Sequence, residues 1–109
     1  MIESCLNCTR EHLGKAHGYL LESLTGRYPA RFWKCIGQMS LAFEESYRSY
    51  PEVAKIIDSE KRKMIEDEDY LTDFDPLIDM VTSIANKEYE VLSNNNKTLT
   101  PIKEENIND

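Results

Sequence analysis

Apolar residues recur every three or four positions along most of the chain, which is the spacing of one face of an α-helix. The first stripe consists of small or apolar residues: Leu6, Thr9, Leu13, Ala16, Leu20 and Leu24. It predicts a helix over residues 3–24. Ser4 is the expected N-cap, because its hydroxyl can accept a hydrogen bond from a free amide of the first turn. Gly26 is expected just past the C-terminal end, where a left-handed residue often stops a helix.

Three later segments repeat this periodicity and predict helices over residues 30–48, 51–65 and 76–92. Short connections between helices make neighbours antiparallel. No segment alternates in the manner of a strand. The sequence therefore predicts an all-α fold, a small helical hairpin or bundle of about four helices in a single domain over residues 1–92. Residues 93–109 are rich in Asn and poor in large apolar side chains, so a disordered tail is expected there.

Composition narrows the possible partners. The chain has 109 residues, 40% of them hydrophobic, and a formal net charge of −7. Such an acidic chain is poorly suited to a nucleic-acid backbone, which attracts clustered cations. No apolar run approaches the roughly 18 residues of a membrane-spanning helix, and the first nine residues lack the features of a secretory signal. We therefore expect a cytoplasmic protein with neither a membrane nor a nucleic-acid partner.

Charge is unevenly distributed along the chain. Residues 1–50 have a net charge of +1, whereas residues 51–109 have a net charge of −8. Basic and aromatic residues are interleaved in the first half of the chain. Basic side chains hold phosphates, and aromatic rings stack on bases. The candidate ligand-binding residues are Arg10, Lys15, Tyr19, Arg27, Tyr28, Arg31, Trp33 and Lys34. The alternative interpretation is a solvated surface with ordinary ion pairs.

A second candidate site lies near the start of the chain. Cys5, Cys8 and His12 follow one another at helical spacing and would share one helix face. Zinc accepts these ligands in tetrahedral geometry, and Cys35 from the second helix is the natural fourth donor. Zinc is the one candidate cofactor. Alternatively, Cys5 and Cys8 are small buried residues. Three cysteines do not suggest a disulfide framework, and without a βαβ pattern a redox role is not favoured.

Two glycines, Gly14 and Gly18, fall inside the first predicted helix, where each costs about 1 kcal/mol relative to Ala. Close packing of the second helix, aided by Gly37, is the favoured explanation. The alternative is that a ligand or a second subunit lies against the bare backbone.

Catalytic signatures are absent from the sequence. Neighbouring carboxylates such as Glu44 and Glu45 point in different directions on a helix and do not chelate one ion together. The two histidines, His12 and His17, have no convincing nucleophile or orienting acid beside them. We therefore expect a protein that is not an enzyme.

Three segments carry a resemblance: CLNCTREHLGKA, GRYPARFWKCIGQMSLAFEE and YPEVAKII. They are similar to a group of small uncharacterised bacteriophage proteins with the pattern CxxC, HL, GYP and WxxIG. The match covers about the first 60 residues, and Arg27 interrupts the GYP element. This resemblance implies a phage origin and carries no activity.

A shorter stretch, RFWKCIGQMSLAFEES, resembles the helical-hairpin sponge proteins with which phages sequester cyclic-nucleotide immune signals. That resemblance implies a non-enzymatic anti-defence accessory protein that binds a small phosphorylated nucleotide. A homo-oligomer is expected also because so small a core cannot hold all the aromatic residues. The alternative is an acidic protein-interaction module that directly inhibits a host defence protein through the second half of the chain.

Overall fold

The computed structural model describes residues 4–99, and their side chains as far as residue 88. Within that range the chain forms four helices and no strand: α1 (Leu6–Leu24), α2 (Arg31–Ser46), α3 (Pro51–Glu66) and α4 (Phe74–Leu99). The predicted all-α fold is confirmed. No helix among these residues is long and apolar enough to cross a membrane.

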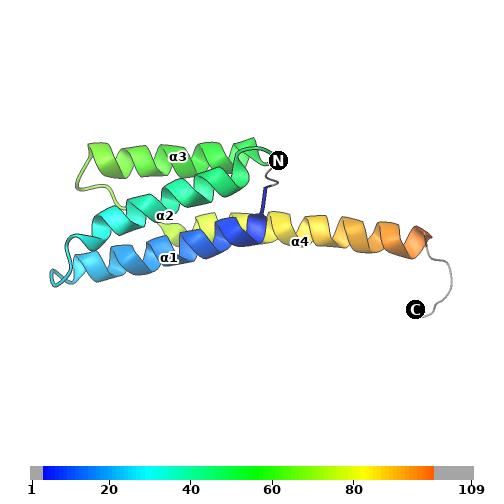
Figure 1. Cartoon of the computed structure of the whole chain (residues 1–109), viewed down its shortest axis with the longest axis horizontal. Helices are drawn as coiled ribbons and strands as arrows, with labels where there is room; N and C mark the ends of the chain where they lie inside the picture. Colours follow the sequence, from blue (N-terminus) through cyan, green and yellow to red (C-terminus); the bar gives the residue numbers. More distant parts are fainter. Residues whose placement is uncertain (1–3, 100–109) are drawn as a thin grey trace.

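α1 and α2 form a central hairpin, and α3 and α4 pack against it (Figure 1). α1 and α2 run antiparallel and make the most extensive contact, α3 packs on α2, and α4 packs on α1. α4 runs along α1, passes its N-terminal end and projects beyond the other three helices (Figure 1). The turn between α1 and α2 and the N-terminal end of α1 therefore lie at opposite ends of the hairpin.

The start of α1 differs from the prediction. Its N-cap is Cys5, whose sulfur accepts a hydrogen bond from the backbone N–H of Cys8 at 3.0 Å. The predicted cap, Ser4, instead accepts a hydrogen bond from the N–H of Ser49 at 2.9 Å. The prediction of Ser4 was wrong because α1 begins at Leu6, so Cys5 occupies the capping position and its sulfur, a weak acceptor, receives the hydrogen bond. The predicted end is confirmed: Gly26 has a φ of 79°.

The limits of α4 also differ from the prediction. It begins at Phe74, two residues before Pro76, because a proline is tolerated in the first turn of a helix. At its other end α4 continues to Leu99, seven residues past the predicted end of the helix. Residues 100–109 of the predicted tail lie outside the described residues.

The core consists of apolar residues from all four helices. The predicted stripe of α1 is buried at every position except Leu24, which lies in the last turn and is 55% exposed. Phe74, which the sequence placed in a connector, is only 1% exposed and stacks on His17 with ring centroids 5.5 Å apart. The largest fully buried apolar side chains are Phe74, Leu13, Met39, Ile57, Met64 and Val81.

The glycines inside α1 and α2 do not mediate helix packing. A Cβ atom added at Gly14, Gly18 or Gly37 would meet no atom within 4 Å, and all three residues are exposed. The expected close packing of α2 against Gly14 and Gly18 is therefore wrong. These two glycines lie on the side of α1 opposite its buried stripe.

Candidate functional site

Aromatic and cationic side chains meet beside the α1–α2 turn. The guanidinium of Arg31 lies 4.7 Å from the ring centroid of Tyr28 and 6.0 Å from that of Tyr19. The ammonium of Lys34 lies 5.7 Å from the Tyr19 ring centroid. Each distance is within the range of a cation–π interaction. We call Tyr19, Tyr28, Arg31 and Lys34 the turn cluster.

Local structure explains why these four residues meet. Arg31 and Lys34 are three residues apart at the start of α2, so they lie on one side of the helix. Tyr19 faces them from the last turns of the antiparallel α1. Tyr28 lies in the turn, where its carbonyl accepts a hydrogen bond from the N–H of Arg31 at 3.0 Å. The short connection therefore brings both tyrosine rings to the cations.

The turn cluster remains accessible from solvent. Tyr28 is 46% exposed, and a shallow hollow of about 330 Å³ beside it is lined by Glu22, Thr25, Arg27 and Tyr28. Arg31 forms an ion pair with Glu22. Three cations thus surround one carboxylate and two aromatic rings. A planar anion could stack on a tyrosine and replace Glu22 as the partner of Arg31, because arginine binds phosphate in bidentate fashion.

Three of the predicted ligand residues do not take part in the cation–π interactions of the turn cluster. Arg10 precedes Tyr19 by nine residues, which places it about half a turn around α1 and about 14 Å along its axis. Trp33 is 62% exposed and packs edge-on against Phe32, with ring centroids 5.0 Å apart. Lys15 is exposed one helical turn before Tyr19, on the same side of α1.

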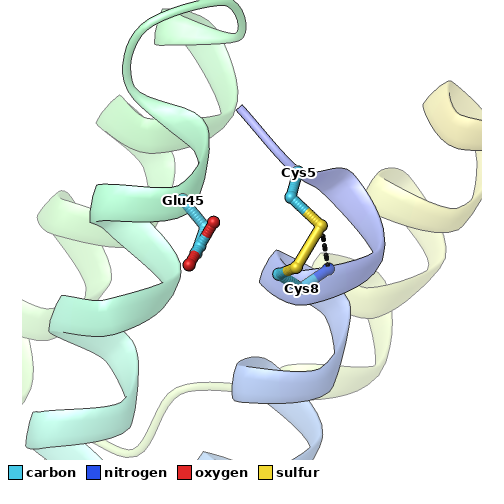
Figure 2. Close-up of side chains that lie close together, drawn as sticks. All are labelled: Cys5, Cys8 and Glu45. Carbon is cyan, nitrogen blue, oxygen red and sulfur yellow. Dashed lines mark hydrogen bonds between the residues drawn. A yellow bond between two sulfur atoms is a disulfide. The ribbon is translucent and has the colours of Figure 1, made fainter. Parts of the chain in front are cut away.

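A second group of reactive side chains lies at the N-terminal end of α1. The sulfurs of Cys5 and Cys8 form a disulfide (Figure 2). Glu45 from α2 faces this pair, and one of its carboxylate oxygens lies within 4.8 Å of both sulfurs (Figure 2). The cysteine count had argued against a disulfide framework; the one disulfide here is a local bridge across a single helical turn.

The four predicted zinc ligands are not gathered in one place. The Nδ1 atom of His12 lies 2.7 Å from Oε1 of Gln38. Cys35 lies ten residues before Glu45 on α2, about 15 Å along the helix axis. Its side chain is fully buried, and that burial raises the pKa of its thiol to about 12. Zinc binding by Cys5 and Cys8 requires free thiolates, so it stays a prediction for the reduced chain.

Glu45 was missed as a partner of the cysteines. Two contacts fix the register of the hairpin: the N–H of Cys5 donates to the carbonyl of Glu45 at 2.9 Å, and His12 meets Gln38. Extending an antiparallel register from the short turn would have placed Glu45, rather than Cys35, opposite Cys5. The sequence contained that signal in the length of the connection.

Comparison with known proteins adds no assignment. No family model, curated protein sequence or solved structure matches this chain. The functional argument therefore depends on the turn cluster, on the cysteine pair and on their surroundings.

Proposed function

We propose that the chain binds a small phosphorylated nucleotide at the turn cluster and releases it chemically unchanged. Arg27, Arg31 and Lys34 hold the phosphates, and Tyr28 stacks on the base. The observation that carries the proposal is the position of the Arg31 guanidinium, 4.7 Å from an exposed tyrosine ring and beside a hollow.

Charge supports an anionic ligand at this position. The chain as a whole has a formal net charge of −7, yet the turn cluster and Arg27 contribute three cations around the single carboxylate of Glu22. A phosphate that binds Arg31 exchanges one anionic partner for another, so the guanidinium is not left without a counter-charge. The aromatic rings add a stacking surface, which distinguishes a nucleotide from a simple phosphate.

The proposed biological role is sequestration of a nucleotide immune signal by a homo-oligomeric phage accessory protein. The resemblance to phage proteins suggests this setting. Self-association is supported by large apolar side chains exposed close to the turn: Leu21 and Leu24 are 54% and 55% exposed. Exposed apolar surface of this kind commonly marks an interface.

Isothermal titration calorimetry with a panel of cyclic nucleotides and ADP-ribose derivatives tests the binding. Loss of one charge-assisted hydrogen bond costs about 1.5–3 kcal/mol. Arg31→Ala and Lys34→Ala should therefore each weaken binding by about 10-fold or more. Arg62→Ala is the matched control, because this exposed arginine on α3 pairs with Asp58 and is not part of the turn cluster.

Two results would contradict the proposal. One is the absence of binding by every member of the panel. The other is an equal loss of affinity in Arg62→Ala and Arg31→Ala, which would indicate nonspecific attraction. Chromatography of the recovered ligand separates binding from turnover: an intact ligand is expected.

The connector after α3 favours a second candidate, an acidic surface that binds and inhibits a host defence protein. Residues 66–69 are four consecutive acidic residues, all exposed. Ile65, directly before them, and Leu71, two residues after them, are 46% and 45% exposed. Converting the four acids to amides should abolish crosslinks from this segment to a basic partner while nucleotide binding persists. Arg31→Ala should weaken nucleotide binding and leave the crosslinks to the basic partner unchanged.

A further inference from the structure

We propose that Cys5 and Cys8 form a thiol–disulfide exchange site for low-molecular-weight disulfides of the glutathione class. In the reduced chain Cys5 is the attacking sulfur and Cys8 is the resolving sulfur. Glu45 accepts the proton that Cys8 gives up. This activity is independent of nucleotide binding, because the pair and the turn cluster lie at opposite ends of the hairpin (Figure 1).

The two sulfurs have different surroundings. The Sγ atom of Cys5 occupies the N-cap of α1 and accepts a hydrogen bond from the N–H of Cys8 at 3.0 Å. The N-terminus of a helix carries a partial positive charge, and thiolates at such positions are stabilised and reactive. Both cysteines are partly exposed, so a dissolved thiol or disulfide can reach them. Cys5 is therefore the better nucleophile of the two.

The backbone holds Cys5 in place without the disulfide. Its N–H donates to the carbonyl of Glu45 at 2.9 Å. Its carbonyl accepts from the N–H of Thr9 at 2.9 Å and from the Thr9 hydroxyl at 3.0 Å. Because these bonds do not involve sulfur, reduction leaves Cys5 at the N-cap and Cys8 in the first turn of α1. The bridge can then close again without a search through other conformations.

A hollow that shares Glu45 with the pair offers space for a small partner. A surface hollow of about 400 Å³ is lined by Glu44, Glu45, Tyr47 and Arg48, and its member Glu45 also faces both sulfurs (Figure 2). Arg48 supplies a cation that can attract the carboxylates of a glutathione-like molecule. Cys35 does not compete for the same partner, because its side chain is fully buried.

The exchange proceeds in two balanced steps. The Cys5 thiolate attacks one sulfur of the small disulfide, forms a mixed disulfide and releases one small thiolate. The Cys8 sulfur then attacks Cys5, closes the Cys5–Cys8 bond and releases the second small thiolate, while its proton passes through Glu45. In total, two protein thiols become a disulfide, the small disulfide becomes two thiols, and two electrons and two protons move to it. An excess of the small thiol reverses both steps.

Equilibration of the native chain with mixtures of reduced and oxidised glutathione, with EDTA present, tests the first part of the proposal. Alkylation and mass spectrometry should show Cys5 and Cys8 gaining or losing label together, reversibly, while Cys35 stays unlabelled. A disulfide that the small thiol fails to reduce in the folded protein would overturn exchange. So would a reduced pair that the oxidised form fails to close.

Single-cysteine variants test the assigned roles. Cys5→Ser retains a hydroxyl that can cap α1, and Cys8→Ser retains the donating N–H, so both variants should fold. Oxidised glutathione should modify Cys5 in the Cys8→Ser variant about 10-fold faster than Cys8 in the Cys5→Ser variant, since helix N-termini activate thiolates to this extent or more. Equal rates would overturn the assignment of Cys5.

Glu45 is tested in the chain with all its cysteines. Glu45→Gln keeps the backbone bond to Cys5 and should lengthen the lifetime of the mixed disulfide by several-fold. Glu44→Gln is the matched control. This neighbouring carboxylate lines the hollow, but it is Glu45 whose carboxylate oxygen lies within 4.8 Å of both sulfurs. Identical lifetimes in the two variants would remove Glu45 from the mechanism. If zinc added without EDTA prevents closure of the reduced pair at micromolar concentration, the pair is a metal site and the proposal fails.

Discussion

Among single residues, Cys35 shows how burial controls the chemistry of a thiol. Its side chain is fully buried, and desolvation raises the pKa of the thiol from 9.0 to about 12. The folded chain keeps this proton up to about pH 12, whereas the unfolded chain loses it near pH 9. The contribution of Cys35 to stability is therefore complete below pH 9 and declines as the pH rises from 9 to 12.

Denaturant unfolding of the Cys5→Ser, Cys8→Ser double variant at pH 8 and pH 10.5 measures this decline without disulfide exchange. Between these values the free energy of unfolding should fall by about 2 kcal/mol through Cys35, at 1.36 kcal/mol per pH unit. Adding Cys35→Ala should remove that part of the decline. An unchanged pH dependence after this substitution would show that Cys35 titrates normally.

Substitution by alanine is expected to have opposite effects on stability at Gly26 and at Gly18. Gly26 has a φ of 79°, a conformation that costs an L-residue about 1–2 kcal/mol, so Gly26→Ala should lower the free energy of unfolding by this amount. Gly18 lies inside α1 with no atom within 4 Å of an added Cβ, so Gly18→Ala should raise it by about 1 kcal/mol. Chemical denaturation of the two variants measures both. A destabilising Gly18→Ala would indicate a second subunit packed on that surface.

At the scale of elements, the attachment of α4 depends on the first residues of this helix. Among its described side chains, the buried ones are Phe74, Leu77 and Val81. Replacing a buried phenylalanine with alanine costs about 3–5 kcal/mol, so Phe74→Ala should lower the free energy of unfolding by that amount. Deleting residues 93–109 is the control and should leave thermal unfolding unchanged. Destabilisation by this deletion would move the domain boundary beyond residue 92.

Periodicity was sufficient to predict the four helices, because buried residues recur at helical spacing along α1, α2 and α3. It was insufficient at the end of α4 that carries Phe74, where a proline suggested a helix start two residues too late. It also could not place Glu45 beside Cys5, since that contact depends on the register between two helices. The turn cluster was predicted in part: Tyr19, Tyr28, Arg31 and Lys34 meet, whereas Arg10 and Trp33 lie elsewhere on their helices.

At the scale of the whole molecule, we propose that the exposed apolar surface close to the turn is the interface of a homo-oligomer that binds the ligand. Leu21 and Leu24 lie on α1 close to the turn and contribute little to the core, since more than half of each side chain is exposed. Replacing both with Glu should therefore convert an oligomer to a monomer without unfolding it. Leu71→Glu is the matched control, because Leu71 is 45% exposed on the connector before α4. That variant should keep the subunit number of the parent.

Native mass spectrometry of the untagged protein reports subunit number and co-purified nucleotide in one spectrum. The parent chain should appear as an oligomer, the Leu21→Glu, Leu24→Glu variant as a monomer, and Arg31→Ala as an oligomer without added mass. Circular dichroism verifies that each variant keeps its helices. A parent chain that is monomeric at micromolar concentration would refute self-association. Nucleotide-sized mass on that monomer would still support binding at the turn cluster, because Tyr19, Tyr28, Arg31 and Lys34 all belong to one chain.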